Sequence, residues 1–492
     1  MRNPLLLGID LTAATTVAVV EPGRGVVAYD SRAADVRSTR PGWAEVDPRQ
    51  WWRQVCELLP KVVKTAGATP GDITAVAVAG TAPAVVLADQ AAKPLRPAIL
   101  PADERAVEQR AGLHLQLAGV DLLNLTGSAL TRPAVAPLLM WLTTHEPEAW
   151  RRTAAVLGPA EWLATVLGAT VHIETNWARA SGLYTLAGEP ADAVLDAAAL
   201  SGERLAPVRR AGEQVGTVST AAAEATGLTA DTPIVAGSAD HVLTACAAGL
   251  TDPGDLLLGL GDSGELLAVA GERLVDQRLF LAEHPVPGRW LPYGRMATTG
   301  ALVRWVERLT GTPRPGTLDA AAADRLPATI VCQPYFDGEQ SPLHDPLLRG
   351  SFVGLHLGHD AADLYRACLE ATAYGFRQLV EVLTEHDLRL GLARLTGGAT
   401  SPLWRQILAD VLRRPLYPLM DTPVAAVGAT AAAGVGTGAF ADWAEAVGLI
   451  RMGAPVEPTG KAELAYEESY QVYRSLQDEL RPASHRLAPR SR

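Results

Sequence analysis

The chain has 492 residues, a length that allows about two to four domains. Hydrophobic residues make up 48% of the chain and charged residues 20%, which is typical of a globular protein with sizeable cores. The net charge of −11 argues against a general nucleic-acid or anionic-membrane surface, although glycine amides and helix N-termini can still bind a phosphorylated small molecule.

The first half of the chain begins with three short β-like runs, at residues 5–10, 15–20 and 25–29, that we expect to form an antiparallel meander. A helix is expected at 47–66, because Asp47 and Pro48 suit its N-cap and first helical position. Strand-like and helical patterns then alternate. The expected strands are 73–78 and 84–89, and the expected helices are 161–167 and 191–199.

A second series of strands and helices begins after residue 231. The strand 233–236 and the helix 241–248 precede two strands, 256–261 and 265–270, that begin a second meander. Further helices are expected at 302–310, 361–385, 401–413, 424–434 and 461–480. We therefore predict an N-terminal domain over 1–235, a C-terminal domain over 236–480 and a disordered basic tail over 481–492.

The sequence pattern favours a cytoplasmic protein. The apolar run Leu5–Leu7 is too short for a signal peptide. The uncharged stretch 422–441 is mostly Ala and Gly, which favours a buried, closely packed helix over a membrane span. The four cysteines are widely spaced and form no C-x-x-C motif, as expected of buried thiols in a reducing cytosol.

A glycine-framed acidic strand end occurs once in each half of the chain. Gly8-Ile9-Asp10 ends the first apolar run, and Gly261-Asp262-Ser263-Gly264 follows the apolar run 256–260. Such an end can turn sharply and bring backbone N–H groups and hydroxyls to a phosphate. The pair predicts a nucleotide clamped between two related domains.

Asp240 lies in the segment Gly237-Ser238-Ala239-Asp240-His241, which joins a strand to a helix. A carboxylate at this position can be an N-cap. It can also be a general base, because the helix dipole keeps it ionised and able to accept a hydroxyl proton. The two interpretations are compatible. The neighbouring His241 either contacts the substrate or phosphate, or is a capping and partly exposed residue.

Several segments occur together in the order and spacing of one family. They are residues 8–10, 42–48, 103–105, 158–162, 237–249, 261–264, 334–339, 345–354 and 396–406. On these segments the chain resembles the FGGY family of carbohydrate kinases, nearest in pattern to the xylulokinases, over residues 4–480. The resemblance implies an α/β fold with two actin-like (ribonuclease H-like) ATPase domains and an interdomain cleft.

The resemblance also implies an ATP-dependent kinase that phosphorylates a hydroxyl of a small sugar, ketose, polyol or cyclitol, with Mg²⁺ bridging the phosphates. Phosphoryl transfer of this kind needs positioning and charge neutralisation more than covalent chemistry. The partner is therefore a small polyhydroxylated substrate, and neither nucleic acid nor a membrane is expected. Members of the family are often dimers, which makes a homodimer an expectation here too.

The family pattern assigns roles to individual residues of this chain. Asp240 is implied to be the catalytic base, and Asp10, together with Asp240, to hold the magnesium ion. The residues implied to bind the acceptor are Asp103, Thr81, Ala82, Asp240 and His241. The residues implied to bind the nucleotide are Thr12, Ala13, Thr15, Gly261, Asp262, Ser263, Thr299, Gly300, Gly397, Gly398, Ala399 and Ser401.

Three loops depart from the family pattern. Ala13 stands where a hydroxyl residue usually meets a phosphate, and Thr12 or Thr15 is then expected to substitute for it. Asp262 puts a carboxylate into a phosphate loop, which is tolerable only if that carboxylate binds the metal, points away or is paired. Residues 80–84 (Gly-Thr-Ala-Pro-Ala) lack the polar contacts of a pentulose site, which argues against D-xylulose as the substrate.

Two alternatives to an active kinase stay open at this point. A catalytically impaired kinase fold that acts as a sugar- or nucleotide-binding sensor accounts for Ala13 and Asp262, and predicts binding without turnover. An actin-like hydrolase predicts phosphate release that needs no sugar. Asp103 speaks against the hydrolase, because a hydrolase needs no carboxylate for a sugar.

Overall fold

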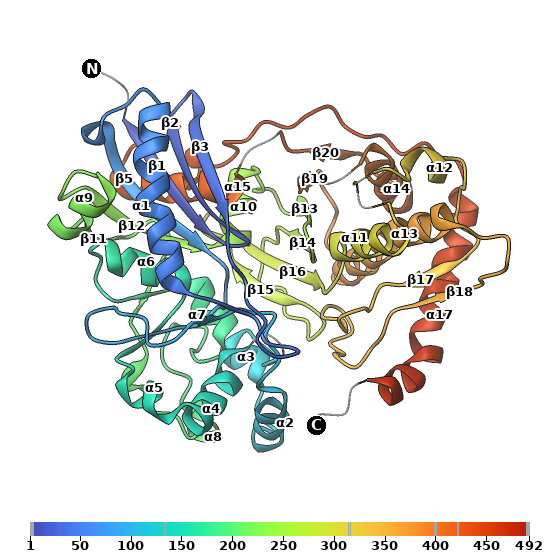
Figure 1. Cartoon of the computed structure of the whole chain (residues 1–492), viewed down its shortest axis with the longest axis horizontal. Coiled ribbons are helices and arrows are strands. Elements are labelled where there is room, and N and C mark those ends of the chain that lie inside the picture. Colours follow the sequence, from blue (N-terminus) through green and yellow to red (C-terminus); the bar gives the residue numbers. More distant parts are fainter. Residues whose placement is uncertain are drawn as a thin grey trace. The chain divides into compact units, whose positions relative to one another are not determined.

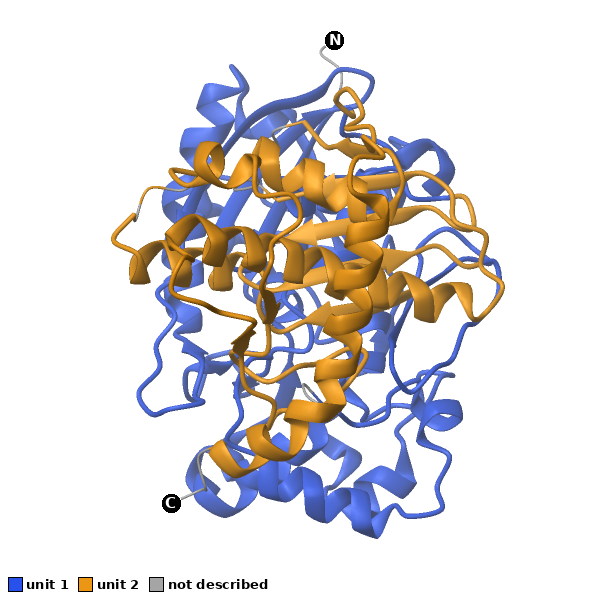
Figure 2. Cartoon of the chain, turned by 90° about the vertical axis from the view of Figure 1, so that its right-hand side faces the viewer, with its two compact units in different colours: residues 1–251, 271–291, 422–451 blue, residues 252–270, 292–421, 452–492 orange. Residues whose placement is uncertain are grey.

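The computed structural model describes residues 4–131, 134–312, 314, 316–397, 401–420 and 423–488 of the chain. The chain forms two compact units, shown in blue and orange in Figure 2. Unit 1 comprises residues 1–251, 271–291 and 422–451, and unit 2 comprises residues 252–270, 292–421 and 452–492. The division into these units differs from the predicted division at residue 235. Residue 235 lies inside strand β12 (Pro233–Ala239), and this strand belongs to the sheet of unit 1. The cleft between the units stays a prediction.

The sheet of unit 1 confirms the predicted meander. Its strand order is β11 (Gln214–Thr217), β12, β5 (Ile73–Gly80), β1 (Leu5–Leu11), β2 (Ala14–Glu21) and β3 (Gly25–Ala33). β1, β2 and β3 are antiparallel neighbours, whereas β5 runs parallel to β1 and β12 runs parallel to β5. The C-terminal ends of β1, β5 and β12 therefore meet at one edge of the sheet.

Helices cover both faces of this sheet (Figure 1). Gly8 of β1 faces α15 (Val424–Thr437) so closely that a Cβ on Gly8 would lie 1.9 Å from the carbonyl oxygen of Ala426. On the opposite face, α1 (Pro48–Thr65) packs against β2 and β3, and Asp47 caps it as predicted. The uncharged stretch is thus the buried, closely packed helix that its composition indicates. Within the described residues, no helix combines the length and apolarity needed to cross a membrane.

Shorter elements of unit 1 connect these strands and position much of the candidate site. The helices are α2 (Val107–Gln116), α3 (Leu122–Thr126), α4 (Val135–His145), α5 (Pro147–Arg152), α6 (Pro159–Leu167), α7 (Thr175–Ser181), α8 (Asp192–Ala197), α9 (Thr220–Thr226), α10 (Asp240–Ala247) and α16 (Trp443–Ala446). The strands are β4 (Glu45–Val46), β6 (Val86–Ala88), β7 (Ala98–Ile99), β8 (Ala155–Leu157), β9 (Ile173–Glu174), β10 (Val208–Arg209) and β15 (Phe280–Glu283). Of these, α6, α7 and α10 contact β12 and so lie beside the strand that leads to Asp240.

The sheet of unit 2 repeats the pattern of unit 1. Within unit 2 the strand order is β16 (Trp290–Met296), β14 (Gly264–Ala268), β13 (Leu256–Leu260), β19 (Ala393–Thr396) and β20 (Leu416–Pro418). β13, β14 and β16 form an antiparallel meander, and β19 runs parallel to β13 as β5 does to β1. The duplicated strand ends of the sequence thus belong to two sheets of one design. The other elements are α11 (Gly300–Leu309), α12 (Asp319–Ala323), α13 (Ala361–Thr384), α14 (Pro402–Leu412), β17 (Val331–Gln333) and β18 (Ser351–Val353).

The last helix is longer than predicted. α17 (Glu463–Leu487) includes the first seven residues of the tail that the sequence marks as disordered, so that expectation is corrected for residues 481–487. The physical reason is an anchor on Asp345, whose Oδ2 lies 2.7 Å from His485 Nε2 and 3.8 Å from Arg481 Nε. Tyr466, Tyr470 and Tyr473 are buried along this helix, as packing predicts.

Candidate active site

The edge where β1, β5 and β12 end brings predicted site residues together. In the parallel register Asp10 lies beside Ala79, and Ala79 lies beside Ser238. Thr81 follows the end of β5, and Asp240 follows the end of β12. The register therefore places Asp10, Thr81 and Asp240 at adjacent strand ends, although they are far apart in the sequence.

Asp10 is a buried carboxylate with one free acceptor atom. Thr12 Oγ1 donates a hydrogen bond to Asp10 Oδ2 (2.9 Å), whereas the buried Oδ1 has no hydrogen-bond partner among the described residues. Burial raises the pKa of the Asp10 carboxyl well above its usual range, the negative charge of Asp240 raises it further, and the Thr12 hydroxyl partly opposes both. Two carboxylates that repel each other, one with an unused oxygen, are chemically suited to a cation.

The carboxylate pair fits magnesium in particular. Mg²⁺ is commonly held by one or two protein carboxylates, with phosphate oxygens and water completing its coordination. Over the described parts of the chain, no group of three or more His, Cys, Asp or Glu side chains is arranged to hold a metal. Asp10 and Asp240 would be the protein ligands of a magnesium ion at this edge, and Thr12 fixes the orientation of Asp10.

Asp240 begins helix α10, with Ala239 in the N-cap position. Its side chain is 22% exposed, so the carboxylate is accessible and still lies within the favourable field of the helix N-terminus. The neighbouring His241 is almost completely buried, and its Nδ1 lies 3.5 Å from Asp240 Oδ1. The structure thus replaces the N-cap interpretation of Asp240 with a first-turn position, and it places His241 beneath the carboxylate rather than at the surface.

The first phosphate loop offers one hydroxyl rather than two. Thr12 is half-buried beside Asp10, and Ala13 is exposed. Thr15, by contrast, is buried in unit 1, where its Oγ1 donates to Gln54 Oε1 (2.6 Å). The hydroxyl of Thr15 is therefore committed to the core, which leaves Thr12 as the residue able to replace the missing hydroxyl of Ala13.

The segment Gly80–Ala84 contributes little polar surface. Of its residues only Thr81 is partly exposed, while Ala82, Pro83 and Ala84 are buried. Thr81 N donates to Leu11 O (3.1 Å), which fixes this segment to the end of β1. Trp177 Nε1 donates to Ala84 O (2.8 Å) from the other side. Thr81 Oγ1 also donates to Leu11 O (3.4 Å), so this hydroxyl can still accept a hydrogen bond from an acceptor, and contact between the buried Ala82 and the acceptor stays a prediction.

Asp103 is already saturated with hydrogen bonds. Its Oδ1 accepts from Arg105 N (3.0 Å) and Arg105 Nε (2.8 Å), and its Oδ2 accepts from Arg105 Nη2 (2.7 Å) and Ala44 N (2.7 Å). A carboxylate has about four lone-pair sites, so none is left for a sugar hydroxyl. The geometry makes Asp103 a hydrogen-bond partner of Arg105, so the predicted contact between Asp103 and the acceptor stays a prediction that requires one of these bonds to be given up.

Arg105 is the residue of this cluster with unused capacity. Its guanidinium also pairs with Glu45 (2.7 Å), and its carbon atom Cζ lies 3.7 Å from the centre of the Trp43 ring. Its buried Nη1 has no hydrogen-bond partner within the described residues. Sequence reasoning did not identify this free N–H donor, because it becomes apparent only once the hydrogen bonds of Arg105 to Asp103 and Glu45 are known.

The second phosphate loop, Gly261–Gly264, joins β13 to β14 in unit 2. Thr299 N donates to Asp262 O (2.8 Å) and Gly300 N donates to Gly261 O (2.9 Å), so the start of α11 is fastened to this loop. The Asp262 side chain is 75% exposed and forms an ion pair with Arg304 of α11. Asp262 therefore meets two of the three conditions under which it is tolerable, because it points to solvent and is paired.

Asp262→Asn is expected to lower the KM for ATP about two- to fivefold at low ionic strength, because it removes a negative charge from a loop assigned to phosphate. The effect should shrink as salt is added, since an exposed charge is screened. Steady-state kinetics at low and high NaCl measure it, with Asp478→Asn, an equally exposed acid on α17, as the matched control. A KM that rises in the variant would show that the carboxylate assists nucleotide binding.

The turn after β19 requires glycine. Gly397 has φ +122°, and a Cβ there would lie 2.1 Å from the carbonyl oxygen of Leu260 at the end of β13. Gly398 and Ala399, which the sequence assigns to the same turn, lie outside the described residues. Ser401 caps α14 by accepting from Trp404 N (3.2 Å), and its Oγ donates to Asp319 Oδ1 (3.0 Å). Its hydroxyl is therefore used within unit 2.

A buried pair of glutamates lies behind the strand edge, and sequence reasoning did not single it out. Glu161 of α6 accepts a hydrogen bond from the backbone N–H of Glu174 (3.1 Å). Burial raises the pKa of Glu161 to about 7. Burial, and then the charge of Glu161, raises the pKa of Glu174 to about 8. Such a pair holds a proton at neutral pH, because two adjacent buried carboxylates cannot both ionise cheaply.

Glu161→Gln is expected to stabilise the protein increasingly as the pH rises. The folded protein keeps a proton on Glu161 between the ordinary glutamate pKa of 4.5 and about 7, where the unfolded chain has lost it. The free energy of unfolding of the wild type therefore falls as the pH rises through this window. A shift of one pKa unit corresponds to about 1.4 kcal/mol. Above pH 7 the free energy of unfolding of the variant, relative to that of the wild type, is therefore expected to have risen by about 3 kcal/mol.

Urea unfolding at several pH values measures this gain, with Glu224→Gln, an exposed residue of α9, as the control. The control should follow the wild type at every pH. If the free energy of unfolding of Glu161→Gln changes with pH in the same way as that of the wild type, the glutamate pair holds no proton at neutral pH.

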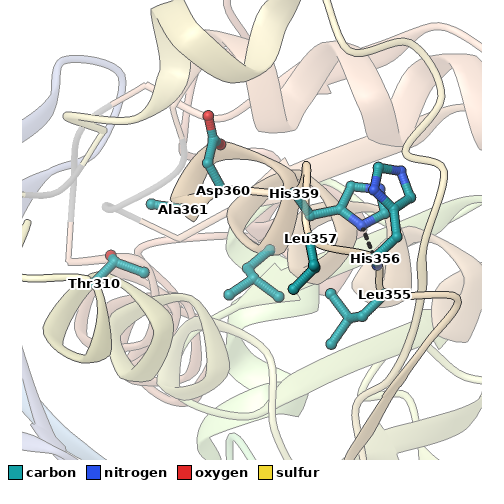
Figure 3. A pocket seen from close by; sticks show the side chains of 8 residues that line it. Thr310, Leu355, His356, Leu357, His359, Asp360 and Ala361 are labelled. Atoms are coloured by element: carbon teal, nitrogen blue, oxygen red, sulfur yellow. Dashed lines mark hydrogen bonds between the residues drawn. The ribbon is translucent and has the colours of Figure 1, made fainter.

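A separate cavity lies in unit 2 (Figure 3). Its volume is about 650 Å³, and His356 N donates to His359 Nδ1 (3.0 Å) at its wall. The lining residues are Thr310, Leu355, His356, Leu357, His359, Asp360, Ala361 and Leu364. None of the predicted nucleotide-binding residues that the structure describes belongs to this lining, so the cavity is distinct from the loops described above.

Comparison with known proteins extends over nearly the whole chain. Residues 5–247 match the N-terminal domain of the FGGY family of carbohydrate kinases, and residues 256–437 match its C-terminal domain. The xylulose kinase of Escherichia coli strain K12 is 28% identical over 490 residues, which cover 97% of this chain and 99% of that protein. The xylulose kinase of Staphylococcus epidermidis is 26% identical over 486 residues, which cover 97% of each.

A solved structure agrees with this likeness in sequence. The crystal structure of the xylulose kinase from Rhodospirillum rubrum has a TM-score of 0.86 and 35% sequence identity, and the match covers 98% of this chain and 100% of that one. The two-unit α/β fold with its repeated mixed sheets is that of the actin-like kinases. The chain therefore belongs to the FGGY family of carbohydrate kinases.

Proposed function

We propose that the protein transfers the terminal phosphoryl group of ATP to a hydroxyl of a small sugar, ketose, polyol or cyclitol. One observation carries the proposal: the accessible carboxylate of Asp240 lies at a helix N-terminus, at the strand edge where Asp10 has a buried, unpartnered oxygen. A general base next to a cation-binding carboxylate is the arrangement that phosphoryl transfer to an alcohol requires.

In this proposal Asp240 accepts the proton of the attacking hydroxyl, which leaves the oxygen able to bond to phosphorus as the bond to the ADP oxygen breaks. The field of the α10 N-terminus favours the negative charge of this carboxylate. Asp10, oriented by Thr12, and Asp240 would hold Mg²⁺, which supplies charge neutralisation at the phosphates when it is bound. The products are ADP and the phosphorylated acceptor.

The nucleotide would bind the glycine-rich turns. In unit 2, the loop Gly261–Gly264, which the N–H groups of Thr299 and Gly300 hold in place, would line the phosphates, and Gly397 leaves room where a side chain would collide with Leu260. In unit 1, the Thr12 hydroxyl would donate to a phosphate in exchange for its hydrogen bond to Asp10, and the neighbouring Ala13 is exposed. ATP is the co-substrate in this assignment.

The acceptor would meet Thr81 and the unused N–H of Arg105, while Asp103 orients Arg105. Both named kinases among the curated relatives act on xylulose, which favours a small ketose. The segment Gly80–Ala84 nevertheless has only Thr81 to hydrogen-bond a hydroxyl. We therefore propose an acceptor of the sugar, ketose, polyol or cyclitol class for which D-xylulose is not the preferred member.

The alternative of an impaired sensor has lost much of its support. Asp262, its main argument, points to solvent and is paired with Arg304. The hydroxyl missing at Ala13 has a neighbouring substitute in Thr12, which already contacts Asp10. Ala13 alone does not require a loss of catalysis.

The experiment is an ADP-release assay with ATP and Mg²⁺ over a panel of ketoses, polyols and cyclitols that includes D-xylulose. We expect one acceptor class to give turnover well above the rate without acceptor, and D-xylulose to have a lower kcat/KM than the best member. Mass spectrometry of the product should show the added phosphoryl group. Binding of ATP or an acceptor without turnover on any member would favour the sensor, and phosphate release independent of acceptor would favour the hydrolase.

A further inference from the structure

Helix α7 is connected to both loops of unit 1 that frame the candidate site. Two consecutive residues make these connections: Asn176 Nδ2 donates to Ser238 Oγ (3.1 Å) on β12, and Trp177 Nε1 donates to Ala84 O (2.8 Å) after β5. Asn176, Trp177 and Ser238 are all buried. A buried side chain that loses its hydrogen-bond partner cannot bond to water instead. These two bonds therefore fix the position of α7 against the strand ends.

The orientation of the Asn176 amide is fixed by its partners. The backbone N–H of Glu283 in β15 donates to Asn176 Oδ1 (2.7 Å), and Asn176 Nδ2 also faces Glu283 O (3.1 Å). Because a backbone N–H can only donate, the oxygen of the amide must point to Glu283 and the nitrogen to Ser238. Rotating the amide would break both sets of bonds at once.

Glu174 holds the start of α7 in place. Its Oε2 accepts from Asn176 N (2.8 Å), and its Oε1 lies 3.3 Å from Asn176 Nδ2. Glu174 in turn donates its backbone N–H to Glu161 Oε1 (3.1 Å) on α6. The bonds from Glu161 through Glu174 and Asn176 to Ser238 form a continuous buried chain, which we name the α7 network.

The α7 network ends two residues before the proposed base. Gly237, next to Ser238, lies so close to β5 that a Cβ there would be 1.8 Å from Val78 O. Ser238 is therefore confined between β5 on one side and Asn176 and Glu174 on the other, and Asp240 follows it after Ala239, at the start of α10. A displacement of Ser238 must move the backbone that carries the Asp240 carboxylate.

We infer that Asn176 is a positioning residue for the phosphoryl transfer, acting on Asp240 through its hydrogen bond to Ser238. The inference rests on the proposed function, since Asp240 is the base only in that proposal. A shift of about 1 Å in a reacting group can cost up to about 100-fold in rate. Asn176 touches neither acceptor nor nucleotide in this assignment, so its loss should lower kcat and leave the KM for ATP unchanged.

The experiment is a double-mutant cycle with Asn176→Ala, Ser238→Ala and the double variant, each measured for kcat and both KM values. Each single variant is expected to lose about 10- to 100-fold in kcat. The double variant should lose no more than the worse single variant, because both break the same link; independent losses would multiply. Ser238→Ala removes one hydroxyl only, so it keeps the cycle informative if Asn176→Ala folds poorly.

Tyr184→Phe is the matched control. Tyr184 is buried shortly after α7, and its Oη donates to Ala206 O (2.9 Å) without touching the α7 network. Its loss removes one buried hydrogen bond from the same region, so kcat should stay within about threefold of the wild type while thermal stability falls slightly. The inference would be overturned if the single variants Asn176→Ala and Ser238→Ala kept the same kcat as this control, or if their losses in kcat multiplied in the double variant.

Hydrogen–deuterium exchange of the peptide that contains residues 237–241 supplies a readout without turnover. Asn176→Ala and Ser238→Ala should speed exchange at this junction, and Tyr184→Phe should not. Unchanged exchange in the first two variants would overturn the inference on its own. A wild type that phosphorylates no acceptor would overturn the proposed function instead, and the exchange result would still decide whether Asn176 holds the junction.

Discussion

Asp240→Asn should lower kcat by about a thousandfold while leaving the fold intact, because an amide cannot take the proton of the attacking hydroxyl. The exchange of oxygen for nitrogen hardly changes the size of the side chain, and the Asp240 side chain is 22% exposed, so an amide can be accommodated there. The KM for the acceptor should change little if the carboxylate acts mainly in the transition state. ADP release with the best acceptor of the panel measures this loss.

The control for this variant is Asp231→Asn. Asp231 is exposed and has φ +65°, a conformation that asparagine tolerates as well as aspartate. Both variants should unfold at the temperature of the wild type, and only Asp240→Asn should lose activity. A variant at Asp240 that keeps more than about a tenth of the wild-type kcat would mean that another group removes the proton.

The parts of the fold that follow local patterns were predictable from the sequence. The meander, the α1 cap at Asp47 and the uncharged helix 424–437 arise from short-range signals, namely strand-length apolar runs, a Pro after Asp and a stretch of Ala and Gly. The meeting of Asp10 and Asp240 was predictable only through the family resemblance, because it depends on the parallel order of β1, β5 and β12.

The partners of individual side chains were not predictable, since they come from distant segments. Thr15 is as close in sequence to the first phosphate loop as Thr12, yet its hydroxyl bonds to Gln54 of α1. Asp262 is paired by Arg304, which lies one turn into the helix that the loop itself positions. A motif identifies residue types at a site, but the hydrogen bonds already used by each side chain decide which of them are available.

The Asp103 cluster illustrates the same limit with larger consequences. The triplet Asp103-Glu104-Arg105 does not by itself show which of its charged groups already has hydrogen-bond partners. In the structure all acceptor sites of Asp103 are taken by Arg105 and Ala44 N, and the unused atom is Arg105 Nη1. We propose that Arg105, rather than Asp103, meets the acceptor, and this proposal has a measurable consequence.

Arg105→Met should destabilise the protein by about 3–5 kcal/mol, because it leaves Asp103 as a buried carboxylate without its cation, while Glu45 keeps only its ion pair with Arg96. The Arg105 and Asp103 side chains are only 1% and 2% exposed, so water cannot replace the lost partner. Arg151→Met is the matched control: its ion pair with Glu148 has side chains 67% and 80% exposed, and its loss should cost at most about 1 kcal/mol. Urea unfolding of both variants measures the difference.

Kinetics of Arg105→Lys separate the two roles of Arg105. Lysine keeps the positive charge between the carboxylates. It lacks the planar guanidinium, which can bond to Asp103 through two nitrogens and still offer an unused N–H. This variant should be more stable than Arg105→Met and should raise the KM for the acceptor while the KM for ATP stays near the wild-type value. If Arg105→Lys restores stability and leaves both KM values unchanged, the free Nη1 has no part in acceptor binding, and Thr81 remains the polar group that distinguishes one acceptor from another.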